Sequence, residues 1–201
     1  MSNSNRAVAS VDTAISSVEI NRYIAGIGQM VTDYIEQGFE AYMVSFMFRL
    51  TLLESGTKDQ QMRDEVSRVY ARFITECVRN PWSEKNRDNR PVLFGCQDWP
   101  VWKRNKKDRL MSLPWEGAHW GSILLVPPRV RLKQGVKDHF ERYKRHVYIR
   151  PGMPLSRIHV EHITYEPRLA VEYTLKSLPH RKCSMDDLFI LPFSQSERPG
   201  H

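Results

Sequence analysis

The chain has 201 residues, of which 41% are hydrophobic and 26% charged, the composition of a globular protein rather than of a disordered or fibrous one. No stretch reaches the roughly 18 unbroken apolar residues that a membrane helix needs. The start, MSNSNRAVAS, is polar and lacks the hydrophobic region of a secretory signal. We therefore expect a cytoplasmic protein with no membrane segment.

The net charge and the positions of the cysteines indicate the kind of partner and the state of the thiols. The 30 Lys and Arg against 23 Asp and Glu give a net charge of +7, which favours a polyanionic partner. Charge alone does not identify that partner. The three cysteines, Cys77, Cys96 and Cys183, are far apart in the sequence and odd in number. This spacing indicates neither a disulfide framework nor a structural zinc site, so we expect three reduced thiols.

The first part of the chain predicts a helix followed by a strand. Apolar residues at helical spacing up to about Gly38 indicate an amphipathic helix within an N-terminal segment, residues 1–40; they are Ile20, Ile24, Ile27, Val31 and Ile35. Residues 41–51 then change to a period of two, which predicts a strand. Its apolar face carries Tyr42, Val44, Phe46, Phe48 and Leu50.

A second helix and a basic segment follow. Asp59 can cap a helix that ends at Asn80-Pro81, with an apolar stripe of Met62, Val66, Val69, Phe73 and Cys77. Residues 91–95 predict a short strand. The next stretch, CQDWPVWKRNKKDR, is rich in tryptophan and basic residues, and we expect it to be an exposed loop.

The last part predicts two more strands, each followed by a helix. Residues 119–126, HWGSILLV, predict a strand closed by Pro127-Pro128, and a basic helix is expected over about 132–145. Residues 157–164 predict another strand, after which Glu166-Pro167 opens a helix to about 178. This order favours an α+β fold with a small antiparallel sheet and helices on one face. We expect it over residues 41–192, with a flexible tail at 193–201.

Tyr173 and Lys176 form a candidate catalytic pair on the last helix. They lie on the side opposite Val171, Thr174 and Leu175, so Tyr173 is not expected in the core. An ammonium beside a phenol favours the phenolate and can hold a phosphate, as a tyrosine nucleophile requires. The alternative is a surface tyrosine stacked on a lysine stem.

His119 is a candidate metal ligand. Two ligands on one strand must be two residues apart to face the same way, but positions 117 and 121 are both glycine. The alternative is a hydrogen-bonded structural histidine.

The basic segment is a candidate nucleic-acid-binding element. Tryptophans interleave with cations there, which suits base stacking beside phosphate contacts; they are Trp99, Trp102, Trp115 and Trp120 with Lys103, Arg104, Lys106 and Lys107. The alternative is that the tryptophans are buried and the lysines only solvate a loop.

Taken in order, SFMFRLT, GAHWGSILLVPP and VEYTLKSL resemble the three motifs of the HUH endonuclease superfamily, over roughly residues 41–178. This superfamily includes the rolling-circle Rep proteins of plasmids and small viruses and the relaxases. Its motifs are a hydrophobic strand, a His-hydrophobic-His strand, and a helix with a catalytic Tyr often followed by Lys. Tyr173 and Lys176 match the third motif, and His119 and Trp120 match the start of the second. Gly121 stands where the second histidine is expected.

The resemblance implies a metal-dependent single-stranded DNA endonuclease. A divalent ion, Mg²⁺ or Mn²⁺, would be bound by His119 and would polarise the scissile phosphate. Tyr173 would attack and become linked to the DNA 5′ phosphate. Further ligands could come from four residues among which no spacing selects, namely Glu116, Asp98, His159 and Glu161.

We therefore carry three hypotheses. The first is a Rep-like HUH protein of plasmid, phage or mobile-element origin that binds single-stranded DNA and nicks and rejoins it. The second is a non-catalytic nucleic-acid-binding module derived from such a fold. The third is an α+β interaction protein whose likeness to Rep is accidental. Adjacent strands at 41–51 and 119–126, with the Tyr173 helix packed so that the Tyr173 hydroxyl approaches His119, would separate the first two from the third.

Overall fold

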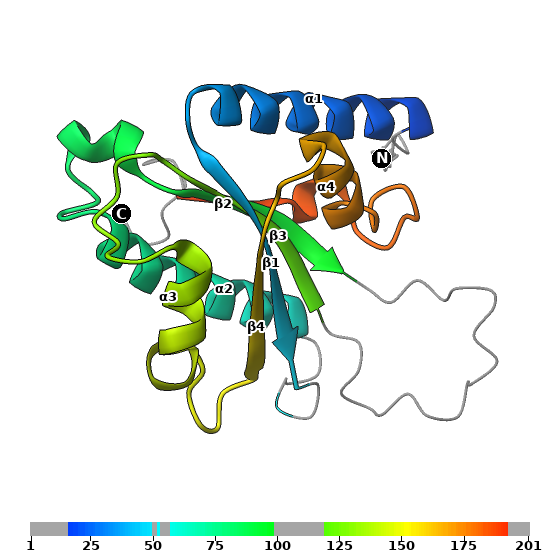
Figure 1. Cartoon of the computed structure of the whole chain (residues 1–201). Coiled ribbons are helices and arrows are strands. Elements are labelled where there is room, and N and C mark those ends of the chain that lie inside the picture. The colour runs from blue at the N-terminus through cyan, green and yellow to red at the C-terminus, as the bar shows by residue number, and fades with distance from the viewer. Residues whose placement is uncertain (1–15, 50–51, 53–56, 99–118, 193–201) are drawn as a thin grey trace, which may run out of the picture.

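The computed structural model (Figure 1) describes residues 16–49, 52, 57–98 and 119–192. Its strands are β1 (Glu40–Phe48), β2 (Val92–Asp98), β3 (His119–Val126), β4 (Leu155–His162) and β5 (Phe189–Leu191). Its α-helices are α1 (Ser17–Glu36), α2 (Lys58–Cys77), α3 (Val136–Tyr143) and α4 (Pro167–Thr174). Short helical turns cover Glu84–Asn89, Lys144–Tyr148 and Met185–Asp187. None of the helices in these ranges is long and apolar enough to cross a membrane.

The strands form one five-stranded sheet in the order β4-β1-β3-β2-β5, with every neighbouring pair antiparallel. Strands β1 and β2 are therefore parallel to each other, joined through α2, with β3 inserted between them. Strands β3 and β4 are joined through α3 in the same way, with β1 between them. Two interleaved split β-α-β units make this a ferredoxin-like arrangement. The predicted α+β class with an antiparallel sheet is confirmed.

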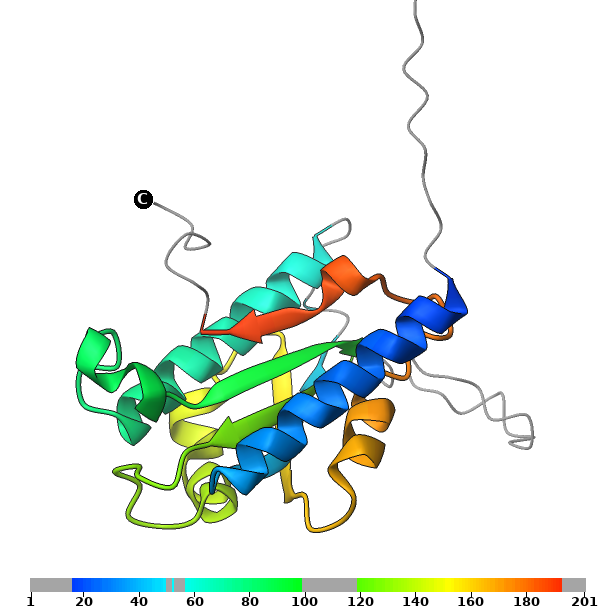
Figure 2. The ribbon, with the colours of Figure 1, turned by 90° about the horizontal axis from the view of Figure 1, so that it is seen from above.

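Helices cover both faces of the sheet, so the expectation that they lie on one face is wrong. Figure 1 shows α1 and α4 above the sheet and α2 and α3 below it, and Figure 2 shows α1 crossing the sheet beside α4. Trp120 and Leu124 of β3 pack in the core cluster of α2 and α3. Ile123 and Leu125 pack in a second cluster with α1 and α4. The apolar run in HWGSILLV is the pattern of a strand buried on both faces.

Several predicted elements are confirmed, with shifted ends. Helix α1 begins with a capping box in which Glu19 N–H donates to Ser16 Oγ at 3.2 Å. Strand β3 has the predicted bounds. Residue Asp59 is not the cap of α2, because it lies in the first turn of that helix. Helix α3 begins only at Val136, and α4 ends at Thr174, before the predicted 178.

Two features near β2 differ from the predictions. Residues 96–98 belong to β2 rather than to an exposed loop, and Cys96 is fully buried there. Strand β5 was not predicted, since a strand of three residues carries too little period-two pattern to be recognised. The predicted tail, residues 193–201, and Leu50 and Thr51 of the first predicted strand lie outside the described residues.

Gly95 provides a test of the sheet. A Cβ added at Gly95 would lie 2.1 Å from the carbonyl oxygen of Gly121 and 2.7 Å from Ser122 Cα. Because both atoms belong to the neighbouring backbone, Gly95→Ala should destabilise the fold by about 3 kcal/mol. A Cβ on Gly26, in α1, meets nothing within 4 Å, so Gly26→Ala should stabilise by about 0.5–1 kcal/mol. Urea unfolding measures both; equal stabilities of the two variants would contradict the close packing of β2 on β3.

Candidate nucleic-acid interface

Helices α1 and α4 leave one end of their sheet face uncovered. Strand pairing lines up Asp98, His119, Met47 and Arg157 in a row across four strands. These residues share the face of Ile123, and each is partly or fully exposed. In the neighbouring row Gly121, Ser45 and His159 are partly exposed, whereas Cys96, the partner of Gly121 on β2, is buried. We call these two rows the open rows of the sheet.

Gly121 is where α4 lies closest to β3. A Cβ at this position would be 3.6 Å from the carbonyl oxygen of Thr174 and 3.8 Å from its Cγ2. A methyl group would fit, but an imidazole would extend into the space that Thr174 occupies. Position 121, where the HUH motif has a histidine, therefore carries a residue small enough for α4 to pack on β3.

The seating of α4 leaves Tyr173 in solvent beside the open rows. Ala170, Val171 and Thr174 are buried against the sheet, whereas Tyr173 is 58% exposed. The prediction that Tyr173 lies outside the core is confirmed. Leu169, one turn earlier on the same side of α4, is 55% exposed, and Tyr165 before the helix is 47% exposed. Tyr173 and Leu169 therefore expose apolar surface on one side of α4, and the ring of Tyr173 is available for stacking.

Lys176 connects Tyr173 to the open rows. Its Nζ lies 4.1 Å from the centroid of the Tyr173 ring and 2.5 Å from Asp98 Oδ2. The hydroxyl of Ser177 donates to Asp98 Oδ1 at 3.4 Å. Asp98 is the cross-strand partner of His119, which brings their Cβ atoms to about 5 Å. We call Asp98, His119, Tyr173 and Lys176 the Tyr173 cluster. The contact between Tyr173 and Lys176 was predicted both for a nucleophile and for a surface tyrosine, so it does not distinguish the two.

The described residues do not fit the expected Mg²⁺ or Mn²⁺ site. Gly121 offers no second imidazole, and the Asp98 carboxylate is already bound by Lys176 and Ser177. His159 pairs with Glu161 at 3.7 Å on β4, two strands and about 10 Å from β3. Within the described ranges, no three His, Cys, Asp or Glu side chains are grouped to hold a metal ion. Glu116 lies outside those ranges.

The predicted nucleic-acid-binding segment is not described by the structure. The residues outside the described ranges include Trp99, Trp102, Lys103, Arg104, Lys106, Lys107 and Trp115. In the sequence this segment stands between Asp98 and His119, two residues of the Tyr173 cluster. Trp120 is not available for base stacking, because it is 1% exposed and packs edge-to-face on Phe189 in the α2 layer.

Sequence reasoning missed Arg157, Ser45 and Met47 as site residues. In the sequence these residues stand on the polar or weakly apolar side of predicted strands. That position alone does not show that they lie together, because it is the strand order that brings β4 beside β1 rather than beside β3.

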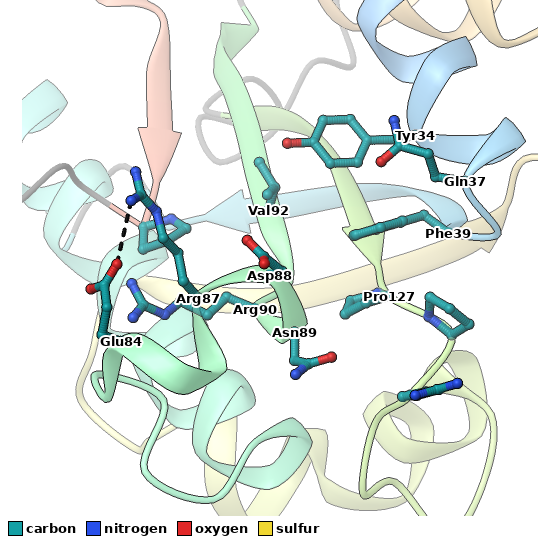
Figure 3. Close-up of a pocket in the computed structure, with 13 residues that line it drawn as sticks. Tyr34, Gln37, Phe39, Glu84, Arg87, Asp88, Asn89, Arg90, Val92 and Pro127 are labelled. Carbon is teal, nitrogen blue, oxygen red and sulfur yellow. Dashed lines mark hydrogen bonds and ion pairs between the residues drawn. The ribbon is translucent and has the colours of Figure 1, made fainter.

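A pocket of about 1090 Å³ lies at the other end of the sheet (Figure 3). Its lining combines the end of α1, the 84–89 turn and the prolines after β3. Arg87 pairs with Glu84 at 3.3 Å, and Arg90 donates to the carbonyl of Ser83 at 3.0 Å. Val92 lines this pocket, and about 20 Å of strand β2 separates it from Asp98. A ligand here would not touch the Tyr173 cluster.

Comparison of the chain with protein-family models, curated proteins and solved structures finds no match. Functional inference therefore depends on the residues of the site itself.

The partly buried Asp98–Lys176 pair can be measured with a double-mutant cycle. Its side chains are 17% and 27% exposed, so Asp98→Ala and Lys176→Ala should show a coupling energy of about 1 kcal/mol. The Arg72–Glu76 pair on α2, with side chains 55% and 42% exposed, is the control and should give about 0.3 kcal/mol. Thermal unfolding of the single and double variants gives both values. A coupling at Asp98–Lys176 no larger than the control would remove this pair as the link between α4 and β2.

Proposed function

We propose that the protein binds single-stranded DNA along the open rows of the sheet and the exposed side of α4. The observation that carries the proposal is the seating of α4 on Gly121. It brings an exposed tyrosine and a lysine to the same sheet end as His119 and Arg157. Cations beside an exposed aromatic ring are what single-strand binding requires, since phosphates need charge and bases need a flat surface.

Charge supports a nucleic-acid ligand at this end. Arg157 lies in the open rows, and the segment 99–118 adds five Lys and Arg against one Asp and one Glu. The net charge of +7 acts in the same direction at longer range. Phosphate contacts of this kind supply affinity without reading bases, so we expect weak sequence preference.

The topology supports the resemblance to the HUH superfamily as the source of this function. The hydrophobic strand of the first motif, β1, is the neighbour of the second-motif strand β3. The helix of the third motif, α4, packs on β3 at the position two residues after His119. The adjacency of β1 and β3 is one of the two features that separate the first two hypotheses from an accidental likeness, and the other is the approach of the Tyr173 hydroxyl to His119.

A second candidate function is nicking by Tyr173, favoured by the contact between its ring and Lys176. The phenol oxygen would attack a DNA phosphorus, the P–O3′ bond would break, and a 3′ hydroxyl would leave, giving a 5′ phosphotyrosine. The Lys176 ammonium is the cation of the Tyr173 cluster that could stabilise charge on the phosphate. Because the described residues do not fit a metal site, no step is assigned to a metal ion.

The binding proposal predicts affinity that falls steeply with salt. Fluorescence anisotropy with a labelled single-stranded oligonucleotide should show affinity decreasing about 50-fold between about 50 and 200 mM salt, as roughly four phosphate contacts require. Tyr173→Ala should weaken binding about tenfold through lost stacking, and Arg157→Gln should weaken it and reduce the salt dependence. Replacing Lys103, Arg104, Lys106 and Lys107 together by Ala should weaken binding to all sequences.

The matched control for this experiment is Arg145→Gln, which removes an exposed arginine from the turn after α3, below the sheet. It should bind as the unmodified chain does. Equal losses in Arg145→Gln and Arg157→Gln would show that only net charge matters and would remove the open rows as the interface.

The nicking candidate predicts a covalent adduct. The unmodified chain, incubated in EDTA with a 3′-labelled oligonucleotide, should give a denaturation-resistant protein–DNA band that Tyr173→Phe abolishes and Lys176→Gln decreases about 100-fold. Both variants should keep their fold, which circular dichroism checks. Binding without any adduct, in EDTA or with Mn²⁺, would leave the non-catalytic module as the function. An adduct that survives Tyr173→Phe would remove Tyr173 from the chemistry.

A further inference from the structure

Cys96 and Cys183 lie together beneath the Tyr173 cluster. They are 87 residues apart in the sequence, yet their sulfur atoms are 3.9 Å apart. Cys96 is fully buried in β2, and its thiol also lies 3.9 Å from the carbonyl oxygen of Thr174. Cys183 is half-buried in the chain that leads from α4 to β5. The sequence spacing had indicated no close pair of cysteines.

The thiols of Cys96 and Cys183 differ in pKa and in exposure to solvent. With both thiols neutral, Cys183 donates to Cys96 and Cys96 donates to the carbonyl oxygen of Thr174. When Cys183 loses its proton, the Cys96 thiol becomes the donor of the shared hydrogen bond, and this lowers the pKa of Cys183. The same hydrogen bond, with burial, raises the pKa of Cys96. Cys183 is thus the thiol that is both more acidic and more accessible to a reagent in solvent. Cys77 is 1% exposed, and burial raises its pKa, so it serves as an internal reference.

We propose that Cys183 and Cys96 form a reversible disulfide when the protein meets hydrogen peroxide. The Cys183 thiolate attacks peroxide, an S–O bond forms, the O–O bond breaks, and hydroxide leaves and takes up a proton. Cys96 then attacks the Cys183 sulfur, the S–S bond forms, and the sulfenic oxygen leaves as water. Two thiols are oxidised, one peroxide is reduced, and two waters are produced. The proposal does not depend on DNA binding or nicking.

The disulfide would restrain the turn that holds the Tyr173 cluster. A disulfide needs a sulfur–sulfur distance of about 2.05 Å, so the sulfurs must approach by about 2 Å. Cys96 is fixed by pairing with Gly121 in the sheet, so the movement falls on the chain around Cys183. That chain is tied to Ser177 by the hydrogen bond from Lys182 N to Ser177 O at 3.0 Å. Oxidation would therefore hold Lys176 and Ser177 more firmly beside Asp98.

The test is peroxide treatment of the full native chain, followed by alkylation, unfolding and tryptic peptide mapping. The expected product is a cross-link between the peptide of residues 88–103 and the peptide of residues 183–201. Its mass should be about 2 Da below the sum of the two, and dithiothreitol should release it. Cys77, in the peptide of residues 73–79, should remain a free thiol. The melting temperature should rise by about 5 °C on oxidation.

Variants assign the two roles. In Cys183→Ser, which alters a half-buried position, Cys96 should stay reduced and its oxidation should slow by about tenfold or more. In Cys96→Ser, Cys183 should accumulate as a sulfenic acid that dimedone traps, and Cys77→Ala should form the cross-link as the unmodified chain does. A cross-link that includes Cys77, thiols that both stay free, or Cys183 oxidised to sulfinic acid without a cross-link would overturn the proposal. If Cys96→Ser does not fold, the proposal is tested by the cross-link in the unmodified chain and by its absence in Cys183→Ser.

Discussion

Incomplete cover of one sheet face by helices decides where polar side chains of the sheet meet solvent. Every strand of the central sheet must remove apolar side chains from water, and α2 and α3 bury the lower face. On the upper face, α1 and α4 bury Ala41, Ile123 and Leu125 but not the end with His119 and Arg157. Polar residues occupy that end because solvent reaches it. The Tyr173 cluster exists only because the upper layer of helices stops short.

The position of α4 on this face depends on a small residue at position 121, because a side chain longer than a methyl group would meet Thr174. Gly121 lets the backbone at Thr174 approach β3, and this approach sends Tyr173 outward and Lys176 back to Asp98. A histidine at 121 would complete an HUH-like motif but would compete with α4 for space. In this structure the space beside His119 is taken by helix packing, and the Asp98 carboxylate pairs with an ammonium. The cation of the cluster is the Lys176 ammonium, and the Asp98 carboxylate balances its charge.

Strand β2 connects this cluster to the cysteine pair. Asp98 and Cys96 are two residues apart, so their side chains share a face of the sheet, and both contact the chain that follows Tyr173. A disulfide at Cys96 would therefore alter contacts of the turn that contains Lys176. The polar pocket near Val92 lies at the opposite end of the same strand and shares no lining residue with the cluster.

The sequence by itself determined the elements whose signals are local. Helix α1, strand β3 and the outward side of Tyr173 follow from spacing along the chain, because burial repeats with the period of a helix or a strand. Tertiary structure decided what depends on strand order and layer position. The Asp98–Lys176 pair joins residues 78 apart, and the Cys96–Cys183 contact joins residues 87 apart, so no periodicity marks either. Whether one or both faces of the sheet are covered also depends on the other elements. An apolar run such as HWGSILLV indicates that the strand is buried, but it does not indicate which helices cover it.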